Sequence, residues 1–397
     1  RTLFHESSLP LIVWSAPYTI LAVAWVVYLF VSYYFATTTP LGLRAFYVYF
    51  EASEALVGGS SLYNGTTGWI YLYPPLVAQL LIPLTFSYHI AIIVWFGLNA
   101  GLLVLTLMLM ARFIPAEKWL LLWLAPLVFI PFWQALYLGQ VTIIMLALLT
   151  VIWVAVRVRR PHMAGMVLAL ATWIKVFPGL LILYFLWKRD WAVLRGVVIA
   201  GMGLLVFQVA LSGPGEMLAF LETLVTLASG GQPQATYENL SIFAFTSRLF
   251  QENTFVEPVY VDEMLFHVSR LVLTLGVFFI AMIAIFRSGV DARQHYTLGR
   301  RFDLEFGTVI LTILLMGSTL WVSGLPPMLL VYVLILRHTE SLLIKVLCGA
   351  SFLLLTLYQP FLVVFRGETL HALVLSTGFM GVILIWFVLI VPLLRTD

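Results

Sequence analysis

The sequence is poor in charge and in cysteine, and each shortage limits the class of protein. Charged residues make up 10% of the 397 residues and hydrophobic residues 62%, whereas a soluble domain carries about 25% charge. With a mean hydropathy of +1.04, this composition indicates a polytopic membrane protein. The net charge of only +3 argues against a nucleic-acid partner. The single cysteine, Cys348, forms no internal disulfide and leaves the redox compartment open.

Several motifs of well-known enzyme classes are also missing. The sequence has no Walker A motif, no GxGxxG, no HExxH and no His/Cys group with metal-ligand spacing. Nucleotide hydrolysis, redox-cofactor binding and zinc chemistry therefore have no support, and we expect neither a cofactor nor a metal site. The alternation typical of a lipid-facing barrel strand is absent as well. The spans should be helices, because every backbone polar group in lipid needs an internal partner.

Long apolar runs are what the sequence does contain. Runs of about 20 residues suit a bilayer, and they predict spans at 11–35, 89–111, 119–136, 141–156, 192–212, 264–286, 304–322, 326–337, 341–365 and 371–394. Two further runs fit poorly, since Leu76–Phe86 is short and Met163–Trp187 is interrupted by Lys175 and Pro178. We expect an all-α, polytopic membrane bundle of about 10–12 transmembrane helices. It should form one integral domain over residues 1–397 without a clear internal repeat, which weakens a secondary-transporter interpretation.

Basic residues predict how these spans are oriented. Three clusters, at 157–160, 188–195 and 287–301, should face the cytoplasm by the positive-inside rule. The first two clusters flank 163–187, so this segment is either re-entrant, with its tip at Lys175–Pro178, or an ordinary span kinked by proline. The two longest loops, 41–75 and 212–262, then lie on the non-cytoplasmic side, and the plasma membrane is the expected location.

The first outer loop, 41–75, holds an unusual group of polar residues. Arg44, Tyr47, Glu51 and Glu54 recur at i, i+3, i+7 and i+10, which predicts an amphipathic helix lying on the outer membrane surface. One interpretation of this face is simple solvation. The other is that Glu51 or Glu54 is a catalytic or ligand-binding carboxylate beside the bilayer.

Lys175 and a charged face at the start of a later span are further candidates. A charge at membrane depth is costly and usually faces a cavity or a partner, for which a phosphate is suitable, although snorkelling is the alternative. Glu263, His267 and Arg270 share one helical face. They could supply a base and a phosphate-binding cation, or form an interfacial ion-pair network. Gln140, at the mouth of a span, has capping or helix packing as its default role.

Read in order, several segments resemble one family. Ala45–Tyr63 resembles its motif "DF-x-x-Y … G-x-x-LY", and Tyr73–Leu76 resembles "YPPL". Gly139-Gln140 resembles "GQ", and Ala164–Pro178 resembles "AG … IK-x-x-P". Lys188–Trp191 resembles the basic-Trp end of that motif, and Asn239–Arg248 resembles "N-x-S … R". The family is glycosyltransferase family 87, the polyprenyl-phosphate-sugar-dependent mannosyltransferases of the GT-C superfamily. The resemblance covers most of residues 40–250.

This resemblance implies a GT-C bundle that transfers a sugar, with mannose expected, from polyprenyl phosphate. The acceptor would be a hydroxyl of a lipid or glycan on the non-cytoplasmic face, attacked with inversion after a carboxylate in the first outer loop removes its proton. The donor phosphate would be held by Lys175, Arg248 and Arg270. The substrate-binding candidates are Tyr49, Tyr73, Gln140, Asn239, His267 and Trp321. Membrane lipids are the remaining expected partners.

Two positions depart from the family pattern. The catalytic aspartate before Phe is replaced by Ala45, and a late "W-x-H" motif is Trp321-Val322-Ser323 here. Ala45 is either an engineered inactivation or a natural divergence in which Glu51 or Glu54 takes over, although Glu51 lies about 120° away from position 45 around a helix. A transporter or flippase of lipid-linked sugar, and an inactive lipid-binding scaffold, stay open as alternative functions.

Overall fold

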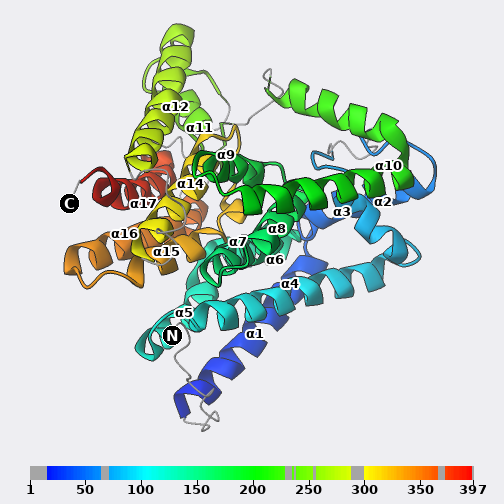
Figure 1. Cartoon of the computed structure of the whole chain (residues 1–397), viewed down its shortest axis with the longest axis horizontal. Helices are drawn as coiled ribbons and strands as arrows, with labels where there is room; N and C mark the ends of the chain where they lie inside the picture. Colours follow the sequence, from blue (N-terminus) through cyan, green and yellow to red (C-terminus); the bar gives the residue numbers. More distant parts are fainter. Residues whose placement is uncertain are drawn as a thin grey trace.

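The computed structural model describes residues 16–63, 71–228, 235–236, 238–253, 256–287, 299–364 and 372–395, and Figure 1 shows their helices. The longer helices are α1 (Ala16–Thr38), α2 (Arg44–Val57), α4 (Tyr88–Ala111), α7 (Thr142–Arg157), α8 (Pro161–Ile174), α10 (Trp191–Ala228), α12 (Glu263–Phe286), α14 (Arg300–Met316), α16 (Leu342–Val364) and α17 (Thr377–Leu394). The shorter elements are α3 (Leu76–Leu81), η1 (Ile82–Leu84), η2 (Ala116–Lys118), α5 (Trp119–Val128), α6 (Ile130–Leu138), η3 (Phe177–Leu180), α9 (Leu181–Trp187), α11 (Ile242–Phe250), η4 (Val322–Gly324), α15 (Met328–Leu336) and η5 (Val374–Ser376).

The predicted class, a polytopic all-helical membrane protein, is confirmed for these residues. Five helices there are long and apolar enough to cross a membrane: Tyr18–Thr38, Tyr88–Ala111, Trp191–Thr226, Glu263–Phe286 and Val374–Leu394. Counted as one span, α5 and α6 make a sixth, although they are bent by 51°. Four shorter apolar helices are Thr142–Arg157, Pro161–Ile174, Phe177–Trp187 and Leu342–Leu357. Several expected spans fall on these shorter helices, so the total of about 10–12 crossings stays a prediction.

Residues 161–187 form a hairpin whose two ends return to the same place. At its entrance, Arg157 Nη1 lies 2.8 Å from Asp303 Oδ1, and at its exit Lys188 Nζ lies 3.1 Å from Glu305. Both carboxylates stand near the start of α14. The break between the two arms falls at Lys175, whose backbone is extended (φ −151°, ψ 123°). This is the shape expected of a re-entrant segment, and its place relative to a bilayer stays a prediction.

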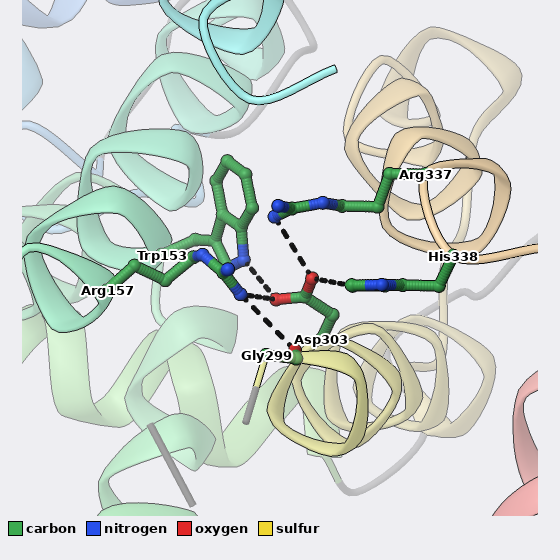
Figure 2. A network of polar contacts seen from close by, with 6 residues as sticks. All are labelled: Trp153, Arg157, Gly299, Asp303, Arg337 and His338. Carbon is green, nitrogen blue, oxygen red and sulfur yellow. Dashed lines mark hydrogen bonds and ion pairs between the residues drawn. The ribbon is translucent and has the colours of Figure 1, made fainter. Parts of the chain in front are cut away.

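Asp303 joins three helical regions at this end of the bundle (Figure 2). Its buried carboxylate accepts hydrogen bonds from Trp153 Nε1 at 2.7 Å and Arg157 Nη1 at 2.8 Å. The other oxygen contacts Arg337 Nη1 at 3.2 Å and His338 Nε2 at 2.6 Å. One carboxylate therefore ties α7 and the end of α15 to α14.

The opposite end of the bundle holds residues 41–63, which belong to the segment named above as the first outer loop, and the orientation in that name stays a prediction. At about 1.5 Å per residue, the part of α10 from Trp191 to Ser212 is about 33 Å long, enough to span hydrocarbon. Gly213 then interrupts the helix with a left-handed φ of 78°, and Figure 1 shows the rest of α10 turning back over the chain. Beyond this bend, Glu216 Oε2 accepts hydrogen bonds from Leu62 N at 3.0 Å and Ser61 Oγ at 3.2 Å. The loop is thus separated from the Asp303 network by the length of α10.

The helix predicted in the first outer loop is confirmed as α2. Phe46, Tyr49 and Phe50 are buried in a hydrophobic cluster with α3, α4 and α7, whereas Arg44 and Glu54 are exposed. The amphipathic pattern thus orients α2 through its apolar face. Its position on a membrane surface remains an expectation.

Candidate functional site

Three residues that were expected to bind substrate meet in one polar cluster. The Tyr49 hydroxyl lies 3.0 Å from Gln140 Oε1 and 3.1 Å from the Tyr73 hydroxyl, and the Tyr73 hydroxyl lies 3.3 Å from the same Gln140 oxygen. Tyr49 comes from α2, Tyr73 from the segment before α3, and Gln140 from the turn before α7. We call these residues the Tyr-Gln cluster. It brings together segments almost 100 residues apart in the sequence.

The glycine before Gln140 is required by its surroundings. Gly139 has a φ of 67°, a left-handed conformation that favours glycine. A Cβ at this position would lie 2.6 Å from the Cβ of Phe46, so α2 packs directly on the Gly139 backbone. The Gly139 carbonyl also accepts a hydrogen bond of 2.9 Å from Trp95 Nε1. The Gly139-Gln140 pair therefore holds the Gln140 amide against Tyr49.

Lys175 reaches this cluster from the break of the hairpin. Its Nζ lies 5.7 Å from the centre of the Tyr73 ring and 5.9 Å from that of Phe177, both cation–π distances. The side chain is half-buried, and among the residues described here no carboxylate or hydrogen-bond acceptor pairs with it. Chemically, Lys175 is a cation held between aromatic rings with its charge available to an anionic ligand.

An apolar cavity of about 320 Å³ lies beside the cluster. It is lined by Val77, Leu80, Leu81, Leu84, Val94, Trp95, Leu98, Leu102, Val141, Ile144 and Ile174, from α3, η1, α4, α7 and α8. Two of these residues, Val141 and Ile174, are the chain neighbours of Gln140 and Lys175. Leu80, Val94 and Leu98 are exposed, so the cavity also meets the outer surface of the bundle. An apolar space with polar groups at one end suits an amphiphilic ligand.

Asn239 and Arg248 are buried residues that form hydrogen bonds with other segments of the chain. Asn239 is fully buried, and its Oδ1 accepts hydrogen bonds from Leu320 N at 2.9 Å and Ser241 N at 3.2 Å. The buried Arg248 donates to the carbonyls of Thr236 and Asn239, each at 2.9 Å, and to Ser376 Oγ at 3.1 Å. These contacts fix the start of α11 and the residues just before it. The described structure gives no contact between either residue and Lys175.

Arg270 and His267 do not join the Tyr-Gln cluster. Both lie on α12, which Figure 1 shows at the upper left, far from α2 at the right. The Arg270 guanidinium stacks 4.8 Å from the centre of the Phe243 ring. His267 Nε2 is 3.6 Å from Glu263 Oε2, and both side chains are mostly exposed. Glu263 and His267 thus form an exposed pair one helical turn apart, and their place at a membrane interface stays a prediction.

The carboxylates expected on α2 do not face the cluster. Ala45 precedes Tyr49 by one turn and shares its side of the helix. Glu51 and Glu54, in contrast, lie about 160° and about 140° around the helix from Tyr49. Glu51 is half-buried and Glu54 is exposed. Neither is aligned with the side of α2 that carries Ala45 and Tyr49.

Trp321 lies close to the same region through the backbone. It forms an isolated antiparallel bridge with Asn239, and the nearby Ser323 carbonyl accepts a hydrogen bond of 2.6 Å from Thr142 Oγ1. Thr142 follows Gln140 by two residues. The segment around Trp321 thus connects the second outer loop to the start of α7.

Glu238 is a carboxylate that the sequence motifs did not single out. It is partly buried, and burial raises the pKa of its carboxyl above the ordinary value, while the positive charge of Arg44 acts in the opposite direction. Its position directly before Asn239-Leu240-Ser241, in a loop poor in lysine and arginine, was the available signal. Over the described ranges, no three His, Cys, Asp or Glu side chains gather as metal ligands would.

Comparison with known proteins bears on this arrangement. The family model described as "Glycosyltransferase family 87" matches residues 71–316, more than half of the chain. The match includes Tyr73, Gln140 and Lys175, but it begins after Ala45 and ends before Trp321. Neither a curated protein nor a solved structure matches the chain. The chain, a polytopic helical membrane protein, therefore belongs to glycosyltransferase family 87.

Proposed function

We propose that this membrane glycosyltransferase takes its sugar, mannose, from a polyprenyl-phosphate donor. The observation that carries the proposal is the apolar cavity whose walls end at the chain neighbours of Gln140 and Lys175. A polyprenyl chain is a long hydrocarbon and its phosphate is anionic. The cavity suits the first isoprene units, and Lys175 suits the phosphate.

In this arrangement the Tyr-Gln cluster would lie beside the sugar of the bound donor. Tyrosine hydroxyls and an amide donate and accept hydrogen bonds, which is what sugar hydroxyls require. An acceptor hydroxyl, on a lipid or a glycan, attacks the anomeric carbon from the side opposite the phosphate, with inversion. The C–O bond to the phosphate breaks, and its electron pair leaves on the phosphate oxygen. The phosphate thereby gains a second negative charge, which Lys175 stabilises.

The arrangement of the two ends supports transfer on the non-cytoplasmic face of the plasma membrane. The basic residues Arg157 and Lys188 are bound at the α14 end of the hairpin, where the positive-inside rule places the cytoplasm. The first outer loop lies at the far end of the spanning part of α10. This assignment leaves Tyr73 and the donor sugar on the outer side.

A single substitution in the cavity tests the donor. Leu98→Trp would fill part of the space beside Trp95, and we expect the affinity for polyprenyl-phosphate-mannose to fall about tenfold, or ~1.4 kcal/mol. Leu105→Trp is the matched control, since Leu105 lies on the same helix, is 61% exposed and does not line the cavity. Binding of radiolabelled donor to the purified protein measures the change.

The same preparation tests the reaction class. The wild-type chain should transfer labelled mannose from this donor to a total polar lipid extract, and should not use GDP-mannose. An unchanged affinity in Leu98→Trp would remove the cavity from the donor site. Passage of the lipid-linked sugar across liposomes without any transfer would favour the flippase alternative and contradict the proposal.

A further inference from the structure

The proposed reaction needs a base, and the obvious positions do not supply one. Ala45 has no proton-accepting group, and Glu51 and Glu54 lie on other sides of α2. A carboxylate that serves the cluster must therefore come from another segment. In the range 212–262, Glu216 already accepts hydrogen bonds from Leu62 N and Ser61 Oγ, and Glu238 is the carboxylate whose backbone adjoins the segment next to Gln140.

The backbone at Glu238 is fixed against the segment that adjoins Gln140. The Glu238 carbonyl accepts a hydrogen bond of 3.1 Å from Val322 N, and the next residue, Asn239, bridges to Trp321. One residue beyond Val322, the Ser323 carbonyl holds Thr142 Oγ1 at 2.6 Å. Two hydrogen bonds thus connect the main chain of Glu238 to the turn that carries Gln140.

A positive charge on α2 acts on the Glu238 carboxyl. The charged group that acts on its carboxyl is Arg44, the chain neighbour of Ala45. The carboxylate is partly buried, and no hydrogen bond or close ion pair occupies it within the described ranges. Burial raises its pKa above the ordinary value more than Arg44 lowers it. A carboxylate with a raised pKa is a stronger base at neutral pH.

We propose that Glu238 is the general base of the transfer and takes the role of the carboxylate absent at position 45. This inference rests on the proposed function. The acceptor O–H bond breaks and its proton passes to a Glu238 oxygen as the acceptor oxygen bonds to the anomeric carbon. The bond between that carbon and the phosphate oxygen breaks, and polyprenyl phosphate leaves with the electron pair. The protonated Glu238 then returns its proton to water.

The test measures donor binding and release of polyprenyl phosphate separately. With polyprenyl-phosphate-mannose and a total polar lipid extract, Glu238→Gln should release polyprenyl phosphate about 10²–10⁴-fold more slowly than wild type. Its donor affinity should be unchanged. Ala45→Asp, added to Glu238→Gln, should restore a large part of the rate by returning a carboxylate to the side of α2 that carries Tyr49.

The pH profile gives a second readout that a structural role would not produce. In the wild type, the rate should rise with pH as Glu238 loses its proton, with a midpoint above that of an ordinary glutamate. The positive charge of Arg44, on α2, lowers the pKa of the Glu238 carboxyl. Arg44→Gln should therefore shift this midpoint upward, and Glu238→Asp should keep a titrating limb that Glu238→Gln lacks. Glu222→Gln, at an exposed position on α10, is the control and should match wild type.

Each outcome is decisive for one of the two proposals. A wild-type release rate in Glu238→Gln would overturn the role of Glu238 and leave the proposed function intact. A wild-type chain that binds the donor but releases no polyprenyl phosphate would contradict the role of Glu238, because the step that Glu238 assists would not occur. Donor recognition would still stand. A loss of activity that follows a lowered unfolding midpoint, without rescue by Ala45→Asp, would make Glu238 structural. A wild-type chain that does not bind the donor would overturn the proposed function itself.

Discussion

Replacing Lys175 with glutamine should lower the rate of sugar transfer about 10²–10³-fold, the usual cost of losing one preorganised charge at a reacting group. The donor is a phosphodiester with one negative charge, and the leaving phosphate carries more. A cation beside it therefore stabilises the transition state more than the bound donor. We expect the loss chiefly in kcat, with a smaller rise in KM.

Lys175→Arg separates charge from shape at the same position. A guanidinium keeps the positive charge and also stacks on aromatic rings, so this variant should retain a large part of the activity. Lys345→Gln, which removes a cation paired with the exposed Glu340, is the control. The rates of wild type and of all three variants are measured as release of polyprenyl phosphate at a saturating donor concentration. Equal rates for wild type and Lys175→Gln would take Lys175 out of the site.

The largest expected effect on stability belongs to Asp303. Asp303→Asn should lower the free energy of unfolding by about 3–5 kcal/mol, the range measured when one partner of a buried ion pair is removed. The asparagine keeps the shape of the side chain but leaves the Arg157 and Arg337 guanidinium groups, each about 13% exposed, without their anion. One Asn oxygen cannot replace the two carboxylate oxygens that Figure 2 shows engaged.

Thermal unfolding of the purified protein in detergent measures this change. Glu340→Gln is the control, because Glu340 is also paired with cations but its side chain is 86% exposed. Because water screens an exposed ion pair, it contributes almost nothing to stability. The unfolding midpoint of Glu340→Gln should therefore equal that of wild type. An Asp303→Asn variant with the wild-type midpoint would show that the network is not a source of stability.

The sequence predicted those site residues that lie in recognisable short motifs. The hydropathy pattern gave the helical membrane class, and the break at Lys175–Pro178 was visible as a charge and a proline in an apolar run. Tyr73, Gln140 and Lys175 were selected by short segments that resemble the family, and the structure brings them together with Tyr49.

The remaining parts depend on contacts between distant segments. Asn239 and Arg248 are buried and hydrogen-bond to other parts of the chain. The sequence around them does not distinguish them from residues that bind a substrate. Arg270 shares its residue type with a phosphate ligand, but α12 carries it away from the cluster. The hydrophobic pattern marked 304–322 as a span without revealing that Asp303, just before it, pairs with residues 150 and 34 positions away. Glu238 was missed because its neighbours are set by segments near 44 and 322.

The Asp303 network also sets an order of events during biosynthesis. Translation supplies Arg157 first, then Asp303, and only later Arg337 and His338. One oxygen of Asp303 can be bound as soon as α14 meets α7, whereas the other waits for the end of α15. A chain that stops after α14 therefore holds a half-satisfied carboxylate in its core. The contacts of this carboxylate are therefore complete only after residues 337 and 338 have been synthesised.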